Sequence, residues 1–137
     1  MAEPASIVIR RRIQWFDTDA SSKYHNTAPL RLMEEAEAAL LDSLGIVREV
    51  YGWLPRRRVE IDYHRPLHFW DEVEVHLEVL AVGGTSVTYG FRISRDGEDH
   101  AEGNVVAVLI DAGGRPLQWP DDWRRLLSES GPLTVER

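Results

Sequence analysis

The stretch that decides the fold is WFDTDASSKYHNTAPLRLMEEAEAALLDSLGI, residues 15–46. Its second half has the spacing of an amphipathic helix over 28–44. Apolar side chains recur on one face of this helix, at Leu30, Met33, Leu40, Leu41 and Leu44. Thr27 is expected to be the N-cap, Pro29 suits the first turn, and Gly45 ends the helix. The sequence therefore predicts one long helix directly after a polar segment rich in acids and hydroxyls.

The rest of the chain has the pattern of strands. Residues 7–16 alternate between apolar and mostly polar side chains. One covered face would carry Ile7, Ile9, Ile13 and Trp15. Four strand candidates follow the helix, with the sequences RVEIDYHRP, DEVEVHLEVLAV, TSVTYGFRIS and HAEGNVVAVLID. Gly83-Gly84 and Asp96-Gly97 favour tight hairpins, because both central residues of a type I′ turn need positive φ. A strand, a long helix and an antiparallel meander predict an α+β domain whose antiparallel sheet wraps around the one helix.

Length and composition limit the kinds of function. The 137 residues suit one domain, residues 1–137, with a core at about 7–120 and a short C-terminal tail or helix at 121–137. The net charge of -7 disfavours nucleic acid as a partner. The chain has no cysteine, which excludes disulfides, thiolate zinc sites and cysteine nucleophiles. No stretch approaches the length of a membrane span and the N-terminus lacks a signal-peptide pattern, so we expect a soluble cytoplasmic protein with no membrane partner.

Several short motifs occur in a fixed order along the chain. Asp17 and Asp19 form an Asp-x-Asp pair, and Glu-Glu-Ala follows on the helix at 34–36. Next comes VEIDYHRPLHFWDEVEV, a strand that runs into a Tyr-x-x-Pro turn and then Asp-Glu-Val, and GRPLQWP closes the series at 114–120. Together these motifs resemble the 4-hydroxybenzoyl-CoA thioesterase family of hotdog-fold proteins, over roughly residues 8–120. The resemblance implies a single hotdog domain that hydrolyses an acyl-CoA thioester to a free acid and a thiol.

The resemblance also assigns roles to individual residues. Asp19 aligns with the family's catalytic carboxylate, and the backbone amides near Asn26 and Thr27 align with the donors that bind the thioester carbonyl. The unpaired N–H groups and partial positive charge of a helix N-terminus suit an oxyanion. Asp17 is expected to order the loop by accepting backbone hydrogen bonds. His25 is either a substrate-binding residue of the site or a loop residue without such a role. No cofactor is implied, and the assembly expected from the family is a homodimer or a homotetramer.

Two positions depart from the family's pattern. Ser22 stands three residues after Asp19, where the family commonly has glycine. The sequence Asn-Thr-Ala-Pro stands where aromatic residues usually precede the helix. We therefore expect the path of this loop to differ from that of the family.

Glu37 falls in the middle of the apolar stripe of the helix, where an unpaired carboxylate is costly. It is either paired with an arginine or a residue of the site. In the second case His25 with Glu37 or Glu34 resembles the histidine and acid of hotdog dehydratases and hydratases, which are the alternative enzyme class. A third alternative is a non-catalytic hotdog protein that binds an acyl ligand.

The thiol carrier is coenzyme A or an acyl carrier protein, and the net charge slightly disfavours docking to an acidic carrier.

The strand after the helix opens with three arginines, Arg56, Arg57 and Arg58. Because guanidinium groups fit phosphate oxygens well, this triplet either captures the phosphates of coenzyme A or lies on a solvated strand end. Glu60 on the same strand is a reserve catalytic carboxylate. His64 and His68 have the spacing of metal ligands on a helix, but Pro66 prevents a helix there, so no metal site is expected.

Overall fold

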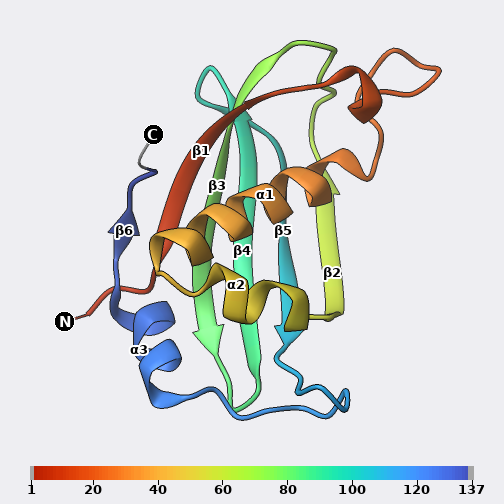
Figure 1. Cartoon of the computed structure of the whole chain (residues 1–137). Coiled ribbons are helices and arrows are strands. Elements are labelled where there is room, and N and C mark those ends of the chain that lie inside the picture. Colours follow the sequence, from red (N-terminus) through yellow and green to blue (C-terminus); the bar gives the residue numbers. More distant parts are fainter. Residues whose placement is uncertain (1, 136–137) are drawn as a thin grey trace.

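The computed structural model describes residues 2–135. Three helices and a six-stranded sheet make up this part of the chain (Figure 1). The helices are α1 (Ala28–Ser43), α2 (Val47–Val50) and α3 (Asp121–Glu129), and single 3-10 turns lie at Trp15–Asp17 and Tyr51–Trp53. The strands are β1 (Ser6–Arg12), β2 (Arg56–Tyr63), β3 (Glu72–Val82), β4 (Ser86–Arg95), β5 (Glu98–Val108) and β6 (Pro132–Leu133).

The strand order in the sheet is β2-β5-β4-β3-β1-β6. α1 crosses one face of this sheet, and the strands curve behind it (Figure 1). The predicted α+β architecture, a sheet wrapped around one long helix, is confirmed. Two details of the prediction are wrong. β2 pairs with β5 and not with the following strand β3, and the sheet is mixed, because the short β6 joins β1 in parallel.

α1 begins and ends almost where the sequence predicts. Its buried side chains are Ala28, Pro29, Leu32, Met33, Ala36, Glu37, Leu40 and Leu41. The buried stripe is turned slightly from the predicted one, since Leu32 is buried whereas Leu30 and Leu44 are only partly so. Each fully buried leucine contributes about 1.5–3 kcal/mol to folding. These contacts fix α1 on the sheet, and with it the position of the helix start.

β1 ends three residues earlier than Trp15, the last residue of its predicted covered face. The three isoleucines of that face are buried, Ile7, Ile9 and Ile13. The chain turns after β1, however, and Trp15 is 73% exposed. Asp17 N–H donates to the Gln14 carbonyl (2.9 Å), and Gln14 N–H donates to Asp17 Oδ2 (2.7 Å). This compact turn replaces the end of the strand.

One of the two predicted turns has the expected conformation. Asp96 and Gly97 both have positive φ, 52° and 79°, as a type I′ hairpin requires. Neither Gly83 nor Gly84 has positive φ, because β3 and β4 are joined by a three-residue connection, residues 83–85.

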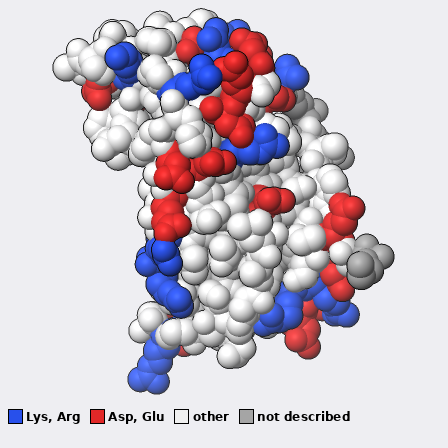
Figure 2. Space-filling model, turned by 180° about the vertical axis from the view of Figure 1, so that it is seen from behind, with Lys and Arg blue, Asp and Glu red and all other residues white. Residues whose placement is uncertain are grey.

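The face of the sheet turned away from α1 is mostly uncharged (Figure 2). A hollow of about 940 Å³ lies on it, lined by residues of β1, β3, β4, β5 and the segment 132–135. This hollow lies on the opposite side of the sheet from the start of α1. Within residues 2–135, no helix has the length and apolar character needed to cross a membrane.

Candidate active site at the start of the long helix

Two loops meet beside the start of α1. Residues 13–27 join β1 to α1, and residues 64–71 join β2 to β3. Tyr24 N–H donates to the Leu67 carbonyl (2.7 Å), and Lys23 forms an antiparallel bridge with His68. The side chains of Tyr24 and Leu67 are buried at this contact. The loop that carries the two aspartates is therefore held by a second loop.

Asp17 is only 3% exposed, although it is a charged residue in a loop. Arg31 of α1 donates from Nε to Oδ1 (2.6 Å) and from Nη2 to Oδ2 (2.7 Å), and Oδ2 also accepts the Gln14 N–H. The Asp17 carbonyl accepts the His25 N–H. Arg31 in turn pairs with Glu35 one helical turn later. Asp17 therefore binds the loop to α1, and these bonds occupy both of its carboxylate oxygens.

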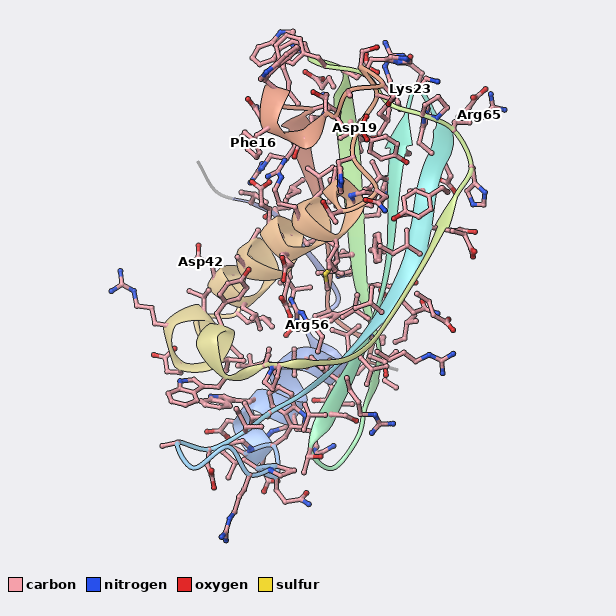
Figure 3. All side chains as sticks on the ribbon, turned by 90° about the vertical axis from the view of Figure 1, so that its right-hand side faces the viewer. Phe16, Asp19, Lys23, Asp42, Arg56 and Arg65 are labelled. Carbon is pink, nitrogen blue, oxygen red and sulfur yellow. The ribbon has the colours of Figure 1, made fainter. Side chains whose placement is uncertain are left out.

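Asp19, two residues later, is exposed and has no arginine partner within residues 2–135 (Figure 3). Its Oδ1 accepts two hydrogen bonds from Ser21, one from the hydroxyl (2.5 Å) and one from the N–H (2.8 Å). These two bonds lower the pKa of Asp19 below its ordinary 3.8, and the bond from the hydroxyl contributes most. The nearby charges of His25 and Lys23 act in the same direction. Oδ2 accepts no hydrogen bond from the described part of the chain. Asp19 is thus an ionised carboxylate with one oxygen free.

Ser22 adopts the left-handed backbone conformation, with φ of 63°. L-residues other than glycine, asparagine and aspartate rarely do so. Ser22 N–H donates to the Asp19 carbonyl (2.9 Å), and Asp19 N–H donates to the Lys23 carbonyl (3.1 Å). At this position, where we expected the loop to take a different path, serine makes a turn of the kind that glycine favours. That turn sets the direction of Asp19.

The start of α1 presents the two backbone amides to which the sequence pointed. Asn26 and Thr27 are both exposed. Asn26 N–H has no acceptor within residues 2–135, whereas Thr27 N–H donates to His25 Nδ1 (3.1 Å). Thr27 is the N-cap by position, but its side chain does not cap the helix: its hydroxyl also contacts His25 Nδ1 (2.8 Å). One amide is therefore open, and His25 covers the other.

Tyr63, at the end of β2, links that strand to the helix start. Its hydroxyl donates to the Asn26 carbonyl. Tyr63 thus forms a wall beside the two amides.

Glu37 is 1% exposed and paired, as the first of its two interpretations predicted. Arg56 donates from Nη1 to Oε2 (2.9 Å) and from Nη2 to Oε1 (2.5 Å), and Nη2 also reaches Glu34 (3.2 Å). Figure 3 shows Arg56 below the middle of α1, away from Asp19. The Tyr89 hydroxyl is buried beside this pair without a hydrogen-bond partner in the described chain. Burial, followed by the charge of Glu37, raises the pKa of Tyr89 well above its ordinary value.

The pairing of Glu37 with Arg56 bears on two sequence hypotheses. Glu37 lies ten residues beyond Thr27, which is about 15 Å along a helix. Within one protomer the structure therefore does not bring Glu37 together with His25 as the histidine and acid of a dehydratase. The Arg56 side chain is only 20% exposed and both of its terminal nitrogens donate to Glu37 or Glu34, so its guanidinium group is not open to a phosphate.

The remaining members of the arginine triplet are exposed on β2. Arg58 pairs with Glu60, and both side chains lie largely in solvent. Five residues separate Arg58 from Tyr63, which is about 17 Å along a strand. Arg57 and Arg58 thus lie toward the end of β2 that is remote from the two amides, whereas Glu60 lies near the middle of the strand.

Arg31 and Tyr63 were missed by the sequence interpretation. Arg31 had one visible signal, its spacing of four residues from Glu35 on a helix. Its bond to Asp17 depends on the path of the loop, which no local pattern predicts. Tyr63 reaches the helix start only because β2 pairs with β5 at the edge of the sheet.

Within the described residues, no three histidine, aspartate or glutamate side chains are grouped so that they could hold a metal ion. The chemistry available at this place is that of a free carboxylate beside backbone donors.

A curved sheet wrapped around one long helix is the arrangement of the hotdog class of proteins. The family model described as the thioesterase-like superfamily matches residues 13–127. The chain belongs to this superfamily. The superfamily is broader than the 4-hydroxybenzoyl-CoA thioesterase family that the motifs resemble.

Two relatives and one solved structure are similar to this chain at 26–28% identity. A 1,4-dihydroxy-2-naphthoyl-CoA hydrolase of Synechococcus elongatus is 27% identical over 135 residues, which cover 91% of this chain and 99% of that protein. A putative esterase of Aquifex aeolicus is 26% identical over 110 residues, or 77% of this chain and 86% of the relative. Among solved structures, a thioesterase of Thermus thermophilus complexed with coenzyme A and Zn is 28% identical, with a TM-score of 0.79, covering 88% of this chain and 90% of that one.

Proposed function

We propose that the protein is a thioester hydrolase that converts an acyl-CoA to a free acid and coenzyme A. The names of its relatives support this class of reaction. The observation that carries the proposal is the contrast between the two aspartates. Arg31 neutralises the buried Asp17, whereas Asp19 is ionised, exposed and in the same loop as the open amide of Asn26.

In the proposed reaction the thioester carbonyl oxygen accepts hydrogen bonds from the N–H groups of Asn26 and Thr27. These donors, at the positive end of α1, stabilise the oxyanion that forms when the carbonyl carbon is attacked. Asp19 either attacks this carbon itself or takes a proton from the water that attacks. The C–S bond then breaks and the thiolate leaves. When Asp19 is the nucleophile, water hydrolyses the resulting anhydride; in both cases the products are the acid and the thiol.

His25 controls one of these donors. Its Nδ1 holds the Thr27 N–H in the present conformation, so the imidazole must move aside before both amides can bind one oxygen. We therefore assign His25 a positioning role at the helix start. Replacing it by alanine frees the amide but also removes the ring that orders residues 25–27.

The protein is further proposed to work as a homodimer, with pairing of dimers into a tetramer as the larger assembly. β2 lies at the edge of the sheet, and its far side has no partner strand in the described chain. Val59 and Tyr63 on this strand are 40% and 49% exposed on the side of α1. An exposed edge of this kind is a template for a second strand, and a second copy of β2 would cover it with the two-fold symmetry usual for dimers.

The experiment is a thiol-release assay with aromatic, short, medium and long acyl-CoAs. We expect turnover with at least one of them and a fall in kcat of about a hundredfold or more in Asp19→Asn, which keeps the shape of the side chain but removes its charge. Asp17→Asn is the matched comparison and should mainly lower stability. Near-normal turnover in a folded Asp19→Asn protein would rule out this mechanism.

The same assay separates the alternatives. Loss of water from a 3-hydroxyacyl-CoA without thiol release would identify a dehydratase. Saturable binding of acyl-CoA without turnover would identify a binding protein. For His25→Ala we expect a smaller fall in kcat than for Asp19→Asn, because the Asn26 amide and the carboxylate remain.

A further inference from the structure

A shallow pocket of about 310 Å³ lies beside the candidate active site. It is lined on one side by Ser21, Lys23 and Tyr24 of the aspartate loop and on the other by Tyr63, His64 and Arg65 at the end of β2. Figure 3 shows Lys23 and Arg65 at the same end of the molecule as Asp19. Of the positive charges around this pocket, the catalytic site uses only that of Lys23, which is the last of the causes that lower the pKa of Asp19.

Two of the lining residues are cations with open donors. The Lys23 ammonium group has no ion-pair partner within residues 2–135. Arg65 pairs through Nε with Glu98 (3.3 Å), and both of these side chains are largely exposed. The two terminal nitrogens of Arg65 have no partner within residues 2–135. His64 lies beside them with Nε2 at 3.1 Å from Glu102. In a chain of net charge -7, a concave place with two open cations is suited to an anion.

The wall of the pocket is aromatic and rigid. The rings of Tyr24 and Tyr63 meet edge to face, with 6.4 Å between their centroids. Tyr24 donates to the Arg65 carbonyl (3.3 Å), and Tyr63 donates to the Asn26 carbonyl. Burial raises the pKa of Tyr24 to about 12, so it remains a neutral donor. These two bonds fix the wall between the aspartate loop and the end of β2.

We propose that this pocket binds the phosphate groups of coenzyme A, with Lys23 and Arg65 as their partners; this inference rests on the acyl-CoA hydrolysis proposed above. The phosphates are separated from the thioester by the pantetheine arm, so they need a site away from the two amides but within reach of one ligand. Four residues separate Lys23 from Thr27, which limits the distance between their Cα atoms to about 14 Å. Guanidinium and ammonium groups are the usual partners of phosphate oxygens.

The pocket also fits this role better than the arginine triplet of β2. Arg56 is bound to Glu37 inside the protein, and Arg58 is bound to Glu60 on the surface. Neither of them lines this pocket. The phosphate partners are therefore assigned to the loop and to the end of β2, and not to the beginning of that strand.

The test uses adenosine 3′,5′-bisphosphate, a fragment of coenzyme A without the thioester, in titration calorimetry with the intact protein. We compare Lys23→Gln/Arg65→Gln with Arg48→Gln/Arg115→Gln, which removes the same charge at two exposed positions elsewhere. We expect the first double variant to weaken binding about tenfold or more and the second to change it little. The affinity of the wild type should fall as salt is added, because exposed phosphate contacts are screened.

Kinetics provide the second readout. At neutral pH Asp19 is ionised with or without the charge of Lys23. At that pH we expect KM for the acyl-CoA to rise in Lys23→Gln/Arg65→Gln, while kcat and the hydrolysis of the matching acyl-pantetheine, which has no phosphate, stay unchanged. An equal loss on both substrates would assign the pair to loop structure and overturn the proposal. The proposal would also be overturned if the wild type did not bind the bisphosphate. The same holds if Arg57→Gln/Arg58→Gln, and not Lys23→Gln/Arg65→Gln, raised KM for the acyl-CoA.

The two proposals fail in different ways. Binding of the bisphosphate through Lys23 and Arg65 without any thiol release would refute the thioesterase and keep the phosphate site. Thiol release with an unchanged KM in Lys23→Gln/Arg65→Gln would support the thioesterase and refute the phosphate site.

Discussion

Arg31 donates a hydrogen bond to each carboxylate oxygen of Asp17, at 2.6 Å and 2.7 Å. Such a two-point contact fixes distance and orientation together. It joins the loop before α1 to the second turn of that helix. Two acids separated by one residue thereby receive opposite environments, one neutralised inside the protein and the other free at the surface.

Replacing Arg31 by methionine should destabilise the fold, because Asp17 would be left buried without its partner. Breaking a buried pair from one side costs about 3–5 kcal/mol, and we expect the lower end since Arg31 is partly exposed. Urea unfolding measures the change, with Arg48→Met as a surface control. A loss below about 1 kcal/mol would contradict the structural role of this pair.

Ser21→Ala should move the acid limb of the rate profile. The Ser21 hydroxyl is the first cause of the lowered pKa of Asp19, so its removal raises that pKa toward 3.8. A carboxylate with a lowered pKa stays ionised to lower pH and loses its charge as pH falls through that pKa. The acid limb of kcat/KM should therefore shift to higher pH in the variant.

Ser22→Ala is the control for this shift, because in the described part of the chain the Ser22 hydroxyl bonds only to the Ser21 carbonyl. An unchanged acid limb in a folded Ser21→Ala protein would mean that the limb belongs to a group other than Asp19.

Arg56→Met should destabilise the protein by about 3–5 kcal/mol, because Glu37 is almost fully buried and would lose its partner. KM for acyl-CoA should stay the same, since the arginine lies inside the protein. Thermal unfolding and steady-state kinetics measure the two effects. Tyr89→Phe, beside the same pair, should cost less than about 1 kcal/mol because the Tyr89 hydroxyl has no hydrogen-bond partner among the described residues. A raised KM with normal stability in Arg56→Met would indicate that Arg56 binds the phosphates of coenzyme A and is not a structural residue.

Val59→Lys should weaken self-association, because it places a charge on the open edge strand. Light scattering over a range of concentrations should show a dimer or tetramer for the wild type and a smaller species for the variant. Leu117→Lys changes a similarly exposed side chain outside the sheet and serves as the control. A wild-type monomer with full activity at micromolar concentration would exclude the proposed assembly.

The fold was predictable wherever a pattern is local. Period-two strands, the apolar stripe of α1 and the Asp96-Gly97 turn each depend on neighbouring residues, and the structure confirms them. Strand order, in contrast, does not depend on neighbouring residues. β2 lies beside β5 because of contacts between distant segments, and alternation alone does not distinguish that partner from β3.

The site was predictable in its location but not in its contacts. The two aspartates and the helix start were visible in the sequence, and the place of Glu37 in the apolar stripe indicated that it needs a partner. Which arginine pairs with it depends on the curvature of the sheet. The same holds for Arg31, whose side chain meets Asp17 only after the loop has turned back on the helix.

The pairing of β2 with β5 also determines when the site can form during folding. The paired residues are far apart in the chain, as Tyr63 with Ala101 and Arg56 with Ala107 show. Local hairpins close before such distant contacts. On a ribosome, β2 must therefore wait for β5 to emerge, and the Tyr63 wall is completed after the β3–β4–β5 meander. Pulse-labelled hydrogen exchange should show protection of β3 and β4 amides before those of β2, so the candidate active site is among the last parts of the molecule to mature.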